Sequence, residues 1–574
     1  MKDVLRIGNA SGFYGDRLAA VREMLTGGEL DVLTGDYLAE LTLLILGRSR
    51  LKDPSKGYAT TFLRQMEDTL GLAVDRGVTV VTNAGGLNPA GLADALREVA
   101  DRLGITVRVA HVEGDDVLGL GLSTSDGPPL TANAYLGAWG IVEALRGGAD
   151  VVVTGRVTDA SLVVGPAAAH FGWARDNWDA LAGATVAGHL LECGAHVTGG
   201  NFAFFTEVPD LTHPGFPIAE VRADGSATIT KHDGTGGAVT VDTVTAQLLY
   251  EIDAPAYRGP DVTSHFDTAL LAQDGPDRVT VSGTRGSPPP PELKVCLTSL
   301  GGFRNAMTFV LTGLDIERKA TLVRSQLDAE LGDRGPRDLT WTLARTDHSD
   351  ADTEEAASAL LHVVAKDSDP KRAGRVFSGA AVELALASYP GFHVTSPPAD
   401  ATPYGVYRPA FIPQDAVDHV AVRADGTKVT VPPPAATGIT TGFSAQSGGA
   451  EVVITGQAAA STGDTVRVPL GTLCGARSGD KGGTANIGVW ARSDTAARWL
   501  TGFLTAERVR ELLPEAAELP VTVYPLPNLR AVNVVIEGLL GEGVASSTRF
   551  DPQAKGLGEW LRSRLVDVPS EVLP

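Results

Sequence analysis

The segment His189-Leu-Leu-Glu-Cys-Gly-Ala-His196 concentrates four side chains that can move protons, attack carbon or bind metal. If it is helical, His189, Glu192, Cys193 and His196 occupy positions i, i+3, i+4 and i+7 and share one face. The Thr198–Asn201 turn that follows can aim backbone N–H groups at the same place. Because Glu and His are costly to bury without a task, we predict the floor of an active site. A satisfied core stripe is the alternative, since Cys is often buried.

Three chemistries are open to this face. General acid–base catalysis by His189 and Glu192 is the leading hypothesis. A thiolate–imidazolium pair of Cys193 and His189, oriented by Glu192, is a second. A divalent metal is a weaker third, because the spacing is not a standard zinc motif. We take as candidate catalytic residues His189, Glu192, Cys193 and Asn201. No metal ligand is assigned and no cofactor is firmly predicted.

Two glycine-rich segments carry polar side chains suited to an anionic substrate. In Lys231–Gly237 the glycines permit a nest of N–H groups, although a plain hairpin turn has the same pattern. Cys474–Asn486 is expected to be a loop, where Arg and Lys could bind a carboxylate, a thioester carbonyl or a CoA phosphate. These segments predict substrate contacts by Lys231, Thr235, Arg477, Ser478, Asp480, Lys481 and Asn486.

The first third of the chain alternates apolar strands with helices, which predicts a mainly parallel sheet covered by helices on both faces. Nearly every strand ends in a small polar turn. Ligands of open α/β sheets bind outside the carboxyl ends of the strands, so these turns are expected to meet near one crevice. Ordinary turn formation is the alternative. The predicted substrate-binding set therefore also includes Asn9, Arg17, Asp36, Asn83 and Arg156.

The pattern of elements predicts an α/β protein of two parts. A large two-lobed unit is expected at 1–455, with lobes at about 1–200 and 201–455. Strands are expected in the second lobe at 294–300 and 307–314, and helices at 318–331 and 354–365. A linker at 456–465 leads to a small ferredoxin-like α+β domain at 466–574.

Composition excludes several classes of protein. The net charge of −21 over 574 residues argues against nucleic acid and against an anionic membrane surface. No apolar run reaches the length of a membrane helix, and the N-terminus begins with a strand-like run rather than a signal peptide. Three scattered cysteines indicate no disulfide framework, so we expect a cytoplasmic protein. The nicotinamide fingerprint and the nucleophile elbow are both missing from the sequence.

The chain resembles the acyclic terpene utilisation protein A (AtuA) family, including its C-terminal ferredoxin-like domain. The motifs that carry the resemblance are Arg6–Asp16, Thr34–Glu40, Thr82–Gly86, Thr154–Asp159, His189–Asn201, Lys231–Gly237, Pro403–Pro409 and Ala476–Gly482. The resemblance implies a link to acyl-CoA catabolism beside biotin-dependent acyl-CoA carboxylases and enoyl-CoA hydratases. It provides no catalytic residues.

We therefore expect a lyase, either a hydratase or dehydratase or a C–C lyase, acting on a branched or isoprenoid-type acyl-CoA. A non-catalytic acyl-CoA-binding or scaffolding subunit and a divalent-metal hydrolase are the alternatives. The expected partners are a small acyl substrate, further copies in a homo-oligomer, and enzymes of an acyl-CoA carboxylase pathway.

Overall fold

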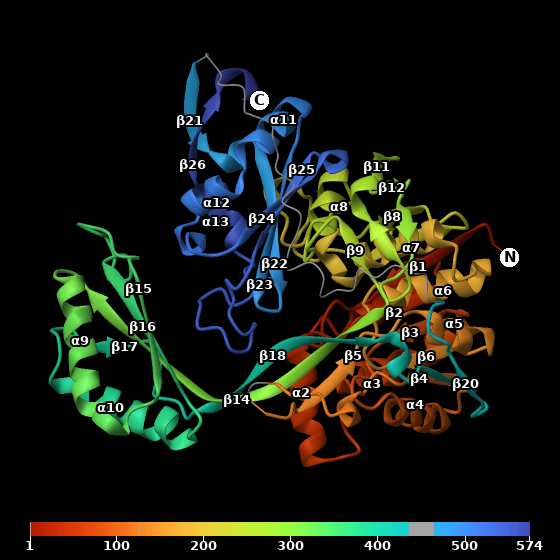
Figure 1. The fold of residues 1–574 in the computed structure, drawn as a ribbon, viewed down its shortest axis with the longest axis horizontal. Helices are drawn as coiled ribbons and strands as arrows, with labels where there is room; N and C mark the ends of the chain where they lie inside the picture. The colour runs from red at the N-terminus through yellow and green to blue at the C-terminus, as the bar shows by residue number, and fades with distance from the viewer. Residues whose placement is uncertain (1, 125–126, 436–463, 574) are drawn as a thin grey trace.

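The computed structural model describes residues 2–124, 127–435 and 464–573 (Figure 1). Within them, an eleven-stranded sheet frames the large unit in the order β11-β12-β8-β7-β1-β2-β3-β6-β4-β19-β20. Five neighbouring strands at its centre are parallel, as predicted. They are β1 (Val4–Asn9), β2 (Val32–Gly35), β3 (Thr79–Thr82), β6 (Val151–Thr154) and β4 (Val109–Glu113).

Antiparallel strands extend this parallel centre on both sides. They are β7 (Pro217–Arg222), β8 (Ala227–Lys231), β12 (Val279–Ser282) and β11 (Leu270–Gln273) beyond β1, and β19 (Val420–Val422) and β20 (Lys428–Thr430) beyond β4. The sheet is thus parallel only at its centre. It joins strands from before and after residue 200, so the expected lobe boundary is not a boundary between sheets.

Helices cover both faces of the sheet, which is why its central strands are continuous apolar runs. One hydrophobic core lies under α1 (Ala20–Gly27), α3 (Thr60–Asp75) and α4 (Pro89–Leu103). The other lies under α5 (Trp139–Arg146), α6 (Ser161–Phe171), α7 (Trp178–Glu192) and α8 (Val241–Leu248). Helix α2 (Glu40–Lys52) instead packs against the second sheet.

The second sheet is built on β14 (Glu292–Thr312), one continuous strand where two were expected. It pairs with β5 (Thr131–Ala134), β16 (Ser358–Asp367), β17 (His393–Val394) and β18 (Thr402–Pro413), and β15 (Asp338–Ala344) extends it. A bulge at Leu300 and Gly302 allows the two expected segments to be joined. A separate three-stranded sheet is formed by β9 (Ala256–Arg258), β10 (Thr263–His265) and β13 (Arg285–Ser287).

The far half of β14 carries a protruding lobe with α9 (Ile316–Leu331) and α10 (Phe377–Glu383), which stands away from the other parts in Figure 1. Helix α9 confirms the expected helix at 318–331. The helix expected at 354–365 is wrong, because that segment contributes to strand β16. Its buried residues Ala359, Leu361, Val363 and Ala365 alternate with period two, the pattern of a strand.

The C-terminal domain has a four-stranded antiparallel sheet in the order β22-β23-β25-β24. Its elements are β21 (Thr465–Pro469), β22 (Cys474–Lys481), β23 (Thr484–Ala491), α11 (Asp494–Phe503), α12 (Ala506–Leu512), β24 (Val521–Leu526), β25 (Ala531–Ile536), α13 (Leu557–Ser563) and β26 (Leu565–Pro569). The loop expected at Cys474–Asn486 is instead the β22–β23 hairpin, which turns at Gly482 with φ of 67°. Of the predicted linker, residues 456–463 lie outside the described residues, and β21 begins at Thr465. No helix in the described ranges could span a bilayer.

The protruding lobe has a hydrophobic core of its own, which includes the fully buried Phe309. We expect Phe309→Ala to cost about 3–5 kcal/mol through lost burial and a cavity. Hydrogen exchange should quicken in α9, α10 and β16 and stay unchanged in β1, β2, β3, β4 and β6. Leu314→Ala, at a residue 83% exposed in the same lobe, is the control. Equal effects of both substitutions would contradict an independent lobe core.

Candidate active site

The predicted chemical face lies at the C-terminal end of α7, where the large unit meets the C-terminal domain. The helix ends at Glu192, Cys193 follows it, and Gly194–His196 form a 3₁₀ turn. His196 is therefore not on the same helical face, contrary to the prediction, because Gly194 takes a φ of 58° that interrupts the helix. Gln247 nevertheless interacts with both Cys193 and His196, so the two side chains stay in one cluster.

His189 forms a second layer behind Glu192. Its imidazole is 1% exposed and packs against the rings of Tyr257 and Phe266. Its Nδ1 lies 3.1 Å from Oε1 of Glu192. Burial, with the nearby positive charge of Lys481, lowers the pKa of His189 to about 4. Both ring nitrogens of His189 lack a hydrogen-bond partner among the described residues, so the contact with Glu192 is one of packing. A neutral His189 thus supports the position of that carboxyl rather than meeting a substrate.

Glu192 faces the charged cluster in surroundings that favour its protonated form. Burial, and then the charge of Asp159, raise the pKa of Glu192 well above its usual value. Its Oε2 is buried and has no hydrogen-bond partner among the described residues. A protonated carboxyl with a free oxygen has the properties of a general acid.

Glu40, at the first position of α2, has the opposite tendency. Tyr135 Oη donates a hydrogen bond to Glu40 Oε1 at 3.1 Å. Burial alone would raise the pKa of Glu40, but Lys294 and Arg156 hold it below its usual value. The pKa values of Glu40 and Glu192 are therefore shifted in opposite directions, and the charge of Arg156 acts on both. Such divergent pairs are typical of acid–base sites.

Residues at the carboxyl ends of the parallel strands meet here, as the strand-end rule predicts. Arg156 Nη1 donates to Asp159 Oδ1 at 2.6 Å, and its guanidinium lies 4.2 Å from the Tyr135 ring centre. Asp36 accepts a hydrogen bond from Asn83 Nδ2 at 2.6 Å. Burial and the charge of Asp159 raise the pKa of Asp36.

The C-terminal domain adds cations to the cluster from the same chain. Lys481 Nζ donates to the Glu251 carbonyl at 3.0 Å, and Lys555 Nζ lies 3.2 Å from Glu251 Oε1. Arg477 Nη2 lies 3.0 Å from His196 Nδ1. Burial and the charge of Glu251 raise the pKa of Asp480 to about 8.

Cys193 is surrounded by these groups but is not activated as a nucleophile. Burial, and then the charges of Glu192 and Glu251, raise the pKa of the Cys193 thiol well above its usual value. Since His189 is also held neutral, the expected thiolate–imidazolium pair has no support. A neutral thiol remains suited to proton donation.

Two buried amides bind the C-terminal domain to the loop that carries Glu251. Asn486 accepts from Glu251 N at 2.9 Å and donates to Leu249 O at 2.8 Å. Asn533 Nδ2 donates to Ile252 O at 3.2 Å and Asp253 O at 2.6 Å. Glu251 has a φ of 55°, a strained conformation that these bonds hold in place.

Several predicted residues have structural partners instead of facing the cluster. Arg17 pairs with Glu23 at 2.8 Å, and Asn9 Nδ2 donates to Leu191 O at 2.6 Å, which ties α7 to β1. Lys231 pairs with Asp277 at 3.0 Å and donates to Thr235 O at 2.7 Å. Ser478 Oγ donates to Ala554 O at 2.6 Å.

The Thr198–Asn201 turn differs from the expected donor loop. The N–H groups of Gly199 and Gly200 donate to the carbonyls of His196 and Ala195, so they are not free for a substrate. Asn201 has a φ of 57°, and its Nδ2 lies 2.8 Å from His196 Nε2. Asn201 thus positions the His196 ring.

Sequence reasoning missed seven residues of the cluster, and these residues share one property. Each comes from a segment remote from α7, so no local spacing connects them: Tyr135, Tyr250, Glu251, Tyr257, Lys294, Tyr407 and Lys555. Tyr407 lies inside the Pro403–Pro409 motif, which is the one signal that pointed to any of them.

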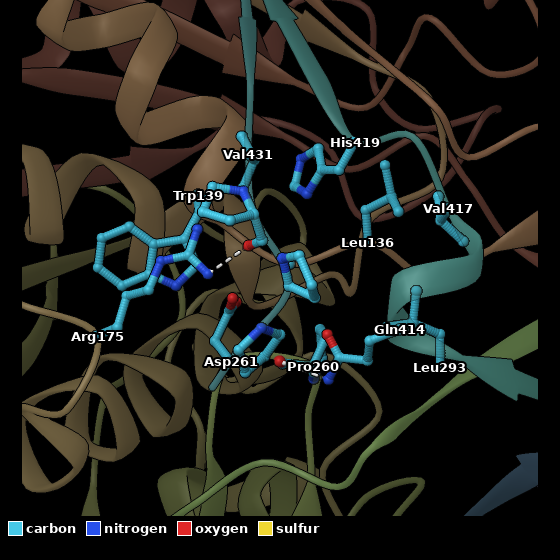
Figure 2. A pocket seen from close by; sticks show the side chains of 14 residues that line it. Leu136, Trp139, Arg175, Pro260, Asp261, Leu293, Gln414, Val417, His419 and Val431 are labelled. Atoms are coloured by element: carbon cyan, nitrogen blue, oxygen red, sulfur yellow. Dashed lines mark hydrogen bonds between the residues drawn. The ribbon is translucent and has the colours of Figure 1, made fainter. Parts of the chain in front are cut away.

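A small cavity between Asp261, His419, Arg175 and Trp139 is distinct from this cluster (Figure 2). Arg175 Nη1 donates to Pro432 O at 2.6 Å on its rim. Its volume of about 30 Å³ holds little more than one water molecule, so it cannot take an acyl chain. In the described part of the chain, no group of three or more His, Cys, Asp or Glu side chains could hold a metal.

Comparison with known proteins gave two matches, both to family models. The model described as acyclic terpene utilisation family protein AtuA matches residues 5–423, and the AtuA ferredoxin-like domain matches residues 468–567. Searches of curated proteins and of solved structures returned no match. The two models cover most of the chain, including α7, the strand ends and the β22–β23 hairpin. The chain therefore belongs to the AtuA family of acyclic terpene utilisation proteins and carries the ferredoxin-like domain of that family.

Proposed function

We propose that the protein is an acid–base lyase acting on a branched, isoprenoid-type acyl-CoA thioester. The proposal rests on two buried carboxyls whose pKa values are shifted in opposite directions, downward at Glu40 and upward at Glu192, with the charge of Arg156 acting on both. In this assignment Glu40 is the base and Glu192 the acid. His189 orients Glu192, and Cys193 is a neutral proton donor.

Two lyase reactions use the same pair of carboxyls. In dehydration, Glu40 takes the proton from Cα, the C–O bond at Cβ breaks, and Glu192 gives its proton to the departing oxygen as water forms. In C–C cleavage, Glu40 takes the proton of a β-hydroxyl, the Cα–Cβ bond breaks, and Glu192 protonates Cα. Either reaction places negative charge on the thioester oxygen in its transition state.

Lys294 is suited to stabilise that charge. Its Nζ lies over the rings of Tyr135 and Tyr407, at 5.0 and 5.7 Å from their centres. In the described ranges this Nζ has neither an ion pair nor a hydrogen bond, and the buried Tyr407 Oη also has no hydrogen-bond partner. Lys481 and Lys555 are already bonded to Glu251. Lys294 and Tyr407, by contrast, each have a donor without a hydrogen bond among the described residues.

Family membership supports the substrate class. The family description names acyclic terpene utilisation, which involves branched isoprenoid chains. The divalent-metal hydrolase gains no support from the described carboxylates and histidines. The homo-oligomer, the carboxylase-pathway partners and the cytoplasmic location stay predictions, as does a binding-only subunit that never turns over substrate.

Replacing either carboxyl tests the assignment. We expect Glu40→Gln and Glu192→Gln each to lower kcat by about 10²–10⁴-fold, because each removes one proton transfer. Turnover is measured by mass spectrometry with panels of branched enoyl-CoA and 3-hydroxyacyl-CoA thioesters. Glu383→Gln, at an exposed residue of the protruding lobe, is the control. A wild-type protein that converts none of these thioesters would instead favour the binding-only subunit.

The raised pKa of Asp480 predicts a pH-dependent stability. A carboxyl with a pKa of about 8 in the native state binds its proton more tightly there than when unfolded. The contribution of this carboxyl to the free energy of unfolding is therefore full below about pH 4 and is lost as pH rises towards about 8. We expect the Tm of Asp480→Asn to rise relative to the Tm of the wild type as the pH is raised from about 5 to about 9. The exposed Asp233→Asn is the control, and a difference independent of pH would refute the assignment.

A further inference from the structure

Arg304 and Lys366 form an unusual pair of like charges in the protruding lobe. They lie directly opposite each other on β14 and β16, an arrangement that destabilises a sheet. Arg304 Nη1 donates to the carbonyls of Ala545 and Ser547 at 3.2 and 3.3 Å, and Lys366 Nζ donates to the carbonyl of Ser546. Neither cation has an ion pair with a carboxylate among the described residues. Two half-buried cations thus lie side by side with no carboxylate in ion-pair contact among the described residues, although the charges of Glu542 and Asp338 reach Lys366.

The face that holds these cations is turned towards the C-terminal domain. The other face of the sheet is covered by α9 and α10, which pack on Phe309 and Leu361. The cationic face also carries His362, whose ring lies 5.4 Å from that of Phe550. Phe550 is a large apolar side chain, yet it is 59% exposed. Burial lowers the pKa of His362 and Lys366, and the charge of Arg304 lowers both further, which outweighs the charges of Glu542 and Asp338 on Lys366.

We propose that Arg304 and Lys366 bind phosphate ester groups and that Phe550 stacks on the purine base attached to them. Arg and Lys are the usual protein partners of phosphate oxygens, and exposed aromatic rings bind bases by stacking. The ligand class is a purine nucleotide with several phosphates. Because this inference rests on the proposed function, the ligand assigned here is the nucleotide end of the acyl-CoA thioester.

The position of this face suits a ligand that spans two sites. Strand β18 pairs with β14 from Thr402 opposite Arg304 to Tyr407 opposite Thr298. Six residues of β14 separate these two levels, which is about 20 Å of extended strand. The two strands run together from the lobe to the large unit in Figure 1. Tyr407 lies beside Lys294 in the active site, so an extended pantetheine arm along β18 would join the phosphates to the thioester.

Calorimetric titration of the full chain tests the assignment without turnover. The probes are CoA, pantetheine, adenosine 3′,5′-bisphosphate and inorganic phosphate. We expect Arg304→Gln and Lys366→Gln each to weaken CoA binding about tenfold or more, because each removes a charge-assisted hydrogen bond, and to leave pantetheine binding unchanged. Arg318→Gln, at a residue of the same lobe with an 87% exposed side chain, is the matched control.

The remaining arms separate the possible outcomes. Phe550→Ser, at an exposed position, should weaken the binding of adenosine 3′,5′-bisphosphate without lowering Tm. The proposal therefore stays testable if the Arg304 and Lys366 variants fail to fold. If inorganic phosphate competes with CoA as strongly as the bisphosphate does, the nucleotide assignment is overturned. CoA binding that is absent, or unchanged in folded Arg304 and Lys366 variants, would overturn the site. A protein that binds CoA through Arg304 but converts no thioester would refute the lyase alone.

Discussion

The whole site depends on the contact of Asn486 and Asn533 with the loop Leu249–Asp253. These amides satisfy backbone groups on four of the five residues of this loop and keep Glu251 at a positive φ, a conformation that costs of order 1–3 kcal/mol by itself. Once the loop is fixed, Lys481 and Lys555 find partners on Glu251. The cations of the C-terminal domain therefore stay close to Glu192, at the end of α7, only while this contact holds.

Crowding of carboxyls explains why the site contains both an acid and a base. Glu192, Glu251 and Asp480 lie close enough to repel one another's negative charge, and burial removes the water that would screen it. Protonation relieves that repulsion. The pKa of Glu40 stays below its usual value because the charges of Lys294 and Arg156 act on this carboxyl. One desolvated cluster thus shifts the pKa values of its carboxyls in opposite directions.

The sequence predicts those parts of the site that are local. Helical spacing found Glu192 and Cys193, and strand ends found Asp36 and Arg156, because period and chain direction fix these positions. Glu251 and Lys294 could not be found, since long-range pairing brings them in. The β22–β23 hairpin was mistaken for a loop because its glycines and charges resemble a turn, whereas pairing with β25 makes it a strand. Likewise, the segment 354–365 fits a helical period in the sequence, whereas its buried residues alternate with the period of a strand.

An anionic substrate would reinforce the protonation states that its own conversion requires. A negative charge placed beside Glu192 and Asp480 favours the neutral form of each, so binding raises their pKa values further. By linkage, the protonated enzyme must then bind the anion more tightly. Lys294, whose charge already acts on Glu40, gains a second negative charge nearby. Substrate binding and readiness of the general acid are consequently one coupled equilibrium, set by the same buried charges.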